Sequence, residues 1–98
     1  MHRNLSEVRP TLDELLGERG KTHGNWIDNA RVAQSTKELW RNEKGWKKLN
    51  AGQREALEMV AHKIARVLCG DPSCVDHWRD IGGYVELVVR ELEDGDEL

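Results

Sequence analysis

Two apolar stripes at helical spacing, separated by a short break, constrain the fold of this chain more than any other feature. The first stripe recurs every three or four residues, as one face of a helix does, at Leu57, Val60, Ala61, Ile64 and Leu68. The second follows the same rule at Trp78, Ile81, Val85, Val88, Val89 and Leu92. Gly70 and Pro72 separate the stripes, because glycine ends helices and proline cannot continue one. So short a loop predicts an antiparallel helical hairpin.

Capping motifs place two further helices before the hairpin. Thr11, with Glu14 three residues later, fits a capping box, and a short helix should follow to about Arg19. The polar stretch Gly20–Gly24 is expected to break the chain before the next helix, because it is bounded by two glycines.

The remaining helix starts follow from the same reasoning. Asn25 is the expected N-cap of a helix that ends near Asn42. Asn50, with Gln53 as its partner, caps the first helix of the hairpin, and Ser73 starts the second. The predicted fold class is therefore all-α, with about four helices and the antiparallel hairpin as the core.

The length of 98 residues fits one domain. We expect a flexible arm over residues 1–10, a single helical domain over 11–93 and an acidic, frayed tail over 94–98. A domain of this size buries only about 60–70% of its unfolded surface, so a homodimer or larger homo-oligomer is expected. The four Trp side chains are large and should anchor the core or an interface.

Charge and hydropathy exclude several classes of function. The net charge of -3 gives no sign of the basic face that general DNA binding needs. No apolar run approaches the roughly 18 residues of a membrane span, and the start lacks the apolar stretch of a secretory signal peptide. We therefore expect a cytoplasmic protein whose two cysteines are reduced thiols.

Paired carboxylates on the two hairpin helices are the strongest chemical signal. Glu55 and Glu58 lie one turn apart on the first helix, and Asp76 and Asp80 lie one turn apart on the second. Carboxylates spaced in this way on facing helices hold divalent metals in helical bundles, and Mg²⁺ prefers oxygen ligands. These four residues are therefore the candidate ligands of a Mg²⁺ site.

Basic and aromatic side chains near these carboxylates suggest a phosphate-bearing ligand. Lys63 and Arg66 are suited to phosphate oxygens, and Tyr84 continues the line of Asp76 and Asp80. The same spacings also fit a solvated face crossed by ion pairs such as Lys63–Asp80 or Arg66–Asp76. Acidic pairs arise by chance in a chain with 34% charged residues, so both interpretations stay open.

The turn between the hairpin helices carries two thiols and an imidazole. Cys69, Cys74 and His77 bracket this turn, but their spacing resembles no common zinc finger, and packed or idle thiols are the alternative. Upstream, His23 fits a ligand, a base or a simple loop residue.

Three segments resemble a family of small, uncharacterised phage and prophage proteins. They are Gly20–Trp26 with Asp28–Arg31, then Glu58–Arg66, and most distinctively Asp76–Tyr84. This resemblance implies a phage-encoded protein. Within the first segment, His23, Trp26 and Asn29 are candidate ligand-binding residues.

A more distant resemblance is to the all-α nucleotide pyrophosphohydrolases of the MazG and dimeric dUTPase type. That family is helical and usually oligomeric, and it holds Mg²⁺ with an ExxE pair on one helix and an ExxD pair on the next. Glu55 and Glu58 match the first pair. Asp76 and Asp80 depart from the second, because they are four residues apart and Arg79 stands where an acid would help. The departure puts catalysis in doubt and leaves nucleotide binding possible.

Three functions follow, in order of preference. The first is a Mg²⁺-dependent, MazG-like nucleoside triphosphate pyrophosphohydrolase with Glu55 and Glu58 as catalytic residues. The second is a module that binds or sequesters a nucleotide without turnover, as a counter to a host defence. The third is a structural or adaptor protein with a Trp-rich interface. The candidate ligand-binding residues are His23, Trp26, Asn29, Lys63, Arg66 and Tyr84.

Overall fold

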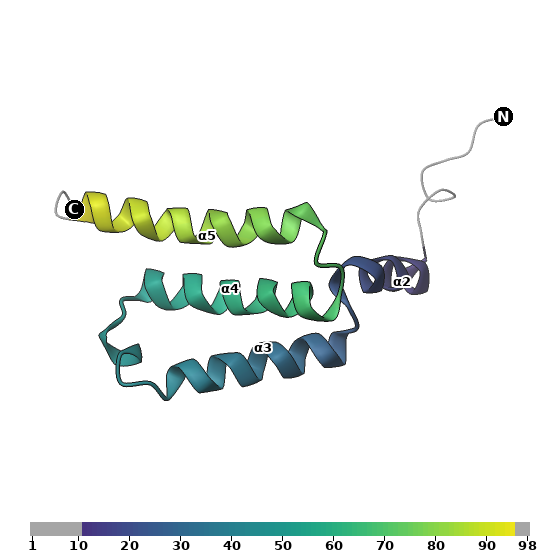
Figure 1. Ribbon diagram of the computed structural model, residues 1–98, viewed down its shortest axis with the longest axis horizontal. Helices are drawn as coiled ribbons and strands as arrows, with labels where there is room; N and C mark the ends of the chain where they lie inside the picture. Colours follow the sequence, from purple (N-terminus) through teal and green to yellow (C-terminus); the bar gives the residue numbers. More distant parts are fainter. Residues whose placement is uncertain (1–10, 96–98) are drawn as a thin grey trace.

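The protein is an array of helices (Figure 1). The structure, a computed structural model, describes residues 11–95, and this part of the chain contains no strand. Its elements are α2 (Leu12–His23), α3 (Trp26–Arg41), the 3₁₀ turn η1 (Trp46–Lys48), α4 (Ala51–Cys69) and α5 (Val75–Asp94). The predicted all-α fold class with about four helices is confirmed. The expected arm over residues 1–10 and residues 96–98 of the expected tail lie outside the described residues, and Asp94 is the last residue of α5.

Helices α3, α4 and α5 lie side by side in one layer, with α4 in the middle (Figure 1). Each runs antiparallel to its neighbour, so the predicted hairpin of α4 and α5 is confirmed. Helix α2 lies at one end of the layer and contacts α4. The layer brings the end of α2, the start of α3 and the last turns of α4 to one place.

Side-chain caps fix where α3 and α4 begin. Asn25 Oδ1 accepts the backbone N–H of Asp28 at 2.8 Å. Asn50 and Gln53 cap each other, with the two backbone N–H groups donating to side-chain oxygens at 2.9 and 2.8 Å. These bonds satisfy N–H groups that have no partner within a helix. Both predicted N-caps are therefore confirmed.

Helix α5 begins slightly later than the sequence predicts. Its N-cap is Cys74, without a side-chain bond, instead of Ser73. Ser73 donates its backbone N–H to Asp71 Oδ1 at 2.8 Å, which closes a turn before the helix. The side chain of Asp71 thus binds the backbone of Ser73, the residue that local preference predicts as the N-cap.

Helix α2 is longer than the sequence predicts. Its capping box at Thr11 is present, but the helix continues through the expected break and ends at His23. The carbonyl oxygen of Thr22 accepts the backbone N–H of Asp71 at 2.8 Å. Contacts with the distant α4–α5 turn therefore hold the last turn of α2, and no local sequence pattern reveals them.

Two glycines let the end of α2 cross the end of α4 in close contact. Gly24 has a φ of 80°, and a Cβ there would overlap the backbone carbonyl of Cys69. A Cβ on Gly70 would overlap the carbonyl of Thr22. The prediction that Gly70 ends α4 is confirmed, and the close approach gives this glycine a second role.

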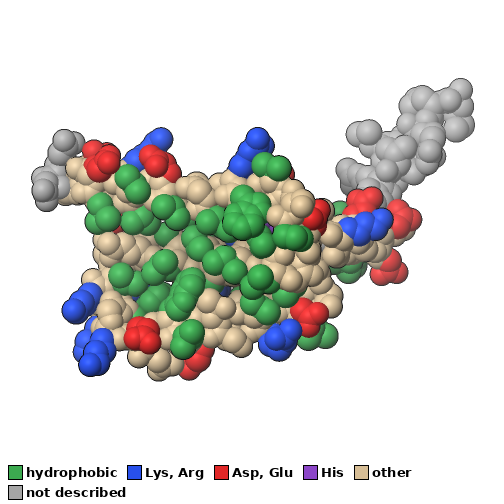
Figure 2. Space-filling model, viewed as in Figure 1, with side chains coloured by type: hydrophobic (Ala, Val, Ile, Leu, Met, Phe, Trp, Pro, Cys, Tyr) green, Lys and Arg blue, Asp and Glu red, His purple; other side chains and the backbone are tan. Residues whose placement is uncertain are grey.

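The core of the layer is thin. In the described part of the chain, the buried apolar side chains are all alanines, namely Ala33, Ala56, Ala61 and Ala65. Larger members of the predicted stripes, such as Leu57 and Val85, stay exposed. Figure 2 shows a broad area of apolar side chains over the layer. The stripes therefore predict which side chains share a face, but the described helices do not bury that face.

Candidate functional site

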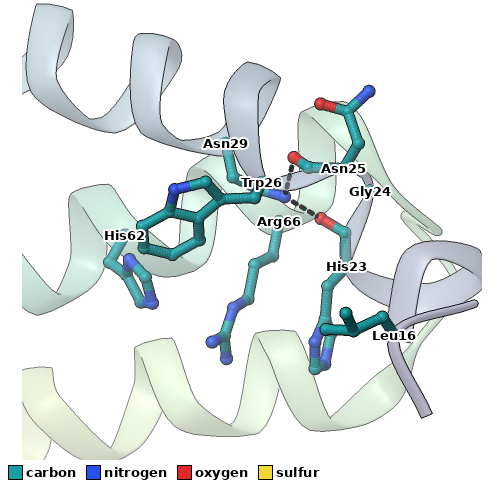
Figure 3. A pocket seen from close by; sticks show the side chains of 8 residues that line it. All are labelled: Leu16, His23, Gly24, Asn25, Trp26, Asn29, His62 and Arg66. Carbon is teal, nitrogen blue, oxygen red and sulfur yellow. Dashed lines mark hydrogen bonds between the residues drawn. The ribbon is translucent and has the colours of Figure 1, made fainter. Parts of the chain in front are cut away.

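A pocket of about 360 Å³ lies where α2, α3 and α4 meet, within the volume range of small-ligand sites. Its lining, drawn in Figure 3, is Leu16, His23, Gly24, Asn25, Trp26, Asn29, His62 and Arg66. Four candidate ligand-binding residues come together here: His23, Trp26, Asn29 and Arg66. His62 also lines the pocket, but it is not among the ligand-binding residues predicted from the sequence. Its spacing of one helical turn from Arg66 is the signal that would have found it.

Asn29 supports the wall of the pocket and is only 7% exposed. Its Nδ2 donates to the carbonyl oxygens of His23 and Asn25, the latter at 2.8 Å (Figure 3). These bonds tie the end of α2 to the start of α3. The Oδ1 of Asn29 is buried and has no hydrogen-bond partner among the described residues. Buried acceptors are nearly always paired, so this atom is an unused acceptor in the pocket wall.

Trp26 provides a large aromatic surface at the pocket. It is the first residue of α3, next to the N-cap, and it is 77% exposed. In Figure 3 its indole extends toward His62 across the space between α3 and α4. An exposed Trp does not contribute to the core, but its flat face is suited to stacking on a planar ligand.

Arg66 and His62 give the pocket its electrostatic character. The Arg66 guanidinium forms no salt bridge with any residue that the structure describes. Burial lowers the pKa of His62 below 6.5, and the positive charges of Arg66, Lys63 and Lys37 lower it further. His62 is therefore mostly neutral near pH 7, and Arg66 supplies positive charge at the pocket.

The substitution His62→Gln is expected to make stability less sensitive to acid. Because the pKa of His62 is below 6.5 in the folded protein, the unfolded chain binds an extra proton as the pH falls through that value. The free energy of unfolding therefore decreases on acidification. Glutamine does not titrate, so the variant should lose less stability between about pH 7.5 and pH 5. Urea unfolding at several pH values measures this. The difference between the free energies of unfolding of wild type and variant at about pH 7.5 gives the effect of the substitution itself. If the two free energies decreased in parallel at lower pH, the lowered pKa of His62 would be contradicted.

Three of the four candidate Mg²⁺ ligands lie in ion pairs. Glu58 Oε2 accepts two hydrogen bonds from Arg41, at 2.7 and 3.1 Å, and Asp76 lies 3.9 Å from Arg79. Asp80 lies 2.8 Å from Lys63 Nζ, and this hydrogen bond, with the charge of Lys63, lowers the pKa of Asp80. The alternative Lys63–Asp80 ion pair is thus confirmed, whereas Arg66 does not pair with Asp76.

The four carboxylates do not converge in the described chain. Within residues 11–95, no three His, Cys, Asp or Glu side chains form a group that could hold a metal ion. Glu55 and Tyr84 line a second pocket of about 270 Å³ between α4 and α5 that also contains Glu91. The Mg²⁺ site stays a prediction, as do the roles of Lys63 and Tyr84 in ligand binding.

Cys69, Cys74 and His77 lie at the turn between α4 and α5. Cys69 and Cys74 are free cysteines. The His77 ring is buried, its Nε2 lies 2.7 Å from the carbonyl oxygen of Thr22, and its centroid lies 5.1 Å from that of His23. The turn thus joins α5 to the end of α2 and so supports one side of the pocket.

The chain matches no model of a known protein family, no curated protein and no solved structure. The resemblances to phage proteins and to MazG-like enzymes therefore stay predictions from the sequence.

Proposed function

We propose that the protein binds a nucleotide or a nucleotide-derived phosphate compound in the pocket between α2, α3 and α4, without turning it over. The observation that carries this proposal is the meeting of an exposed indole and an unpaired guanidinium in one concave site, whose wall Asn29 holds in place. Among the described residues, no carboxylate lines this pocket. An anionic ligand there would therefore not be repelled by a negative side chain of the described lining.

Each group has a distinct role in the proposed complex. Trp26 stacks on the base, since aromatic side chains bind bases through their π-faces at about 1–3 kcal/mol per base. Arg66 binds phosphate oxygens, for which its planar fork is well suited. Asn29 holds the pocket in shape, because its Nδ2 donates to the backbone carbonyls of His23 and Asn25 where α2 meets α3.

The biological setting is also proposed. A phage-encoded protein that captures a nucleotide signal would counter a host defence in the bacterial cytoplasm. The sequence resemblance supports this setting. None of the helices in residues 11–95 has the length and apolar character to cross a membrane.

A thermal-shift screen tests the proposal. Purified protein is heated with nucleoside triphosphates, cyclic dinucleotides or ADP-ribose-type compounds, each with Mg²⁺ and with EDTA. A ligand at 100 times its Kd adds about 2.7 kcal/mol to the free energy of unfolding, so the melting temperature should rise clearly and the rise should persist in EDTA. The absence of a shift with every compound would refute nucleotide binding.

Substitutions in the pocket locate the site. For the compound that binds, Arg66→Gln and Trp26→Ala should each raise the Kd by about tenfold or more, because each removes roughly 1–3 kcal/mol of interaction. Titration calorimetry measures the Kd. The matched controls are Arg54→Gln, exposed on the same helix, and Ile27→Ala, as exposed as Trp26 at 77%. Equal losses in variants and controls would place the ligand elsewhere.

Mg²⁺-dependent pyrophosphohydrolysis is the second candidate, and the position of Glu55 favours it. Glu55 is seven residues before His62, so two helical turns place both on the same face of α4. A carboxylate there would hold Mg²⁺ near a bound triphosphate, and Glu58 would join it on leaving Arg41. Release of pyrophosphate by wild type with Mg²⁺, and its loss in Glu55→Gln, would establish this activity. Unchanged release in the variant would remove Glu55 from the mechanism.

A further inference from the structure

One side of the helical layer is apolar and uncovered. We call it the apolar face and define it by large side chains that share one side of α4 and α5: Leu57, Val60, Ile64, Trp78, Val85, Val89 and Leu92. Their helical spacing places them together, and a shallow groove of about 240 Å³ between the two helices is lined by Leu57, Val60, Val85 and Val88. Figure 2 shows this side as a nearly continuous area of apolar side chains.

The apolar face and the ligand pocket lie on opposite sides of the layer. Ile64 is two residues from His62 and two from Arg66, which places it about 200° around α4 from both. A partner on the apolar face would therefore leave the pocket open. Association through the apolar face and ligand binding in the pocket can therefore be tested separately.

The size of the face matches what a stable dimer needs. Helices α4 and α5, of 19 and 20 residues, packed about 9 Å apart with a rise of about 1.5 Å per residue, present a side of about 500 Å². Two copies would together bury about 1,000 Å², the size that a specific interface should reach.

The chemistry of the face is self-complementary. The central groove is lined by apolar residues and Gln53, without a charged side chain. Two copies of such a surface can meet without burying an unpaired charge. Two-fold homodimers are the commonest assemblies and use the same patch twice. We infer that a second copy of the chain covers the apolar face, so that α4 and α5 of the two copies stack as a four-helix arrangement.

Sedimentation equilibrium of the full chain over a range of micromolar concentrations tests this inference. Wild type is expected at twice the chain mass of 11.2 kDa. Val85→Lys, at a site 50% exposed in the single chain, should raise the dimer Kd about 100-fold, because it buries an unpaired charge at the interface centre. The matched control is Leu87→Lys, on the same helix but outside the apolar face and 62% exposed. It should remain dimeric. Circular dichroism establishes that both variants keep their helices.

Several outcomes would overturn the inference. Wild type that is monomeric throughout would do so, as would Val85→Lys that stays dimeric, or Leu87→Lys that dissociates equally. Should Val85→Lys lose its helices, hydroxyl-radical labelling of wild type decides. Trp78 and Leu92 should become more reactive as the protein is diluted, while Leu87 should not change. Labelling of Trp78 and Leu92 that does not depend on concentration would refute the dimer.

Discussion

The substitution Gly24→Ala is expected to lower the free energy of unfolding by about 3 kcal/mol or more. Gly24 has a φ of 80° and a ψ of 179°, a backbone region that is almost exclusive to glycine. The added Cβ would also overlap the carbonyl of Cys69, at the point where α2 crosses the end of α4. The Cβ is fixed to the Cα of residue 24 and the carbonyl is part of the Cys69 backbone, so neither can move without a shift of its backbone.

The matched control for this prediction is Gly20→Ala. Gly20 lies inside α2, with a negative φ and no atom within 4 Å of an added Cβ. Alanine is favoured over glycine in helices, so this variant should gain up to about 1 kcal/mol. Urea unfolding of both variants measures the difference. Equal effects of the two substitutions would show that the close crossing of α2 and α4 is absent in solution.

The sequence predicts the features of this fold that local chemistry controls. The N-caps at Asn25 and Asn50 were predicted because each bond joins residues three apart, which a capping pattern reveals. The hairpin was predicted because two helices joined by a short turn pack against each other. The end of α2 was predicted wrongly, because its last turn depends on Asp71, which is distant in the sequence.

The contacts around the candidate site also differ in whether a sequence pattern reveals them. Arg41 is 17 residues from Glu58, and no periodicity indicates that the two would pair. Lys63 and Asp80 could be anticipated, because counting back from the hairpin turn places them at the same depth. Helical periodicity shows which side chains share a face of one helix. It does not show which helix or partner covers that face, so the predicted stripes did not reveal that the described core consists of alanines.

His77→Ala is the second substitution with a large expected effect, a loss of about 3 kcal/mol in the free energy of unfolding. His77 is 2% exposed and is the largest fully buried side chain among the described residues. Its Nε2–H donates to the carbonyl oxygen of Thr22 at 2.7 Å. Alanine would leave a cavity and remove the contact by which α5 holds the end of α2.

A second variant separates the effect of the cavity from the effect of the lost hydrogen bond. His77→Leu fills roughly the space of the imidazole side chain but removes the donor, and the carbonyl of Thr22 keeps its bond from the backbone N–H of Asp71. This variant should therefore lose only about 1 kcal/mol. Asp76→Ala, at the exposed neighbouring position, should change stability by less than about 0.5 kcal/mol. Urea unfolding of the three variants gives the comparison. A loss in His77→Ala no larger than that in Asp76→Ala would mean that α5 does not hold α2, and the wall of the pocket at His23 would then lack its support.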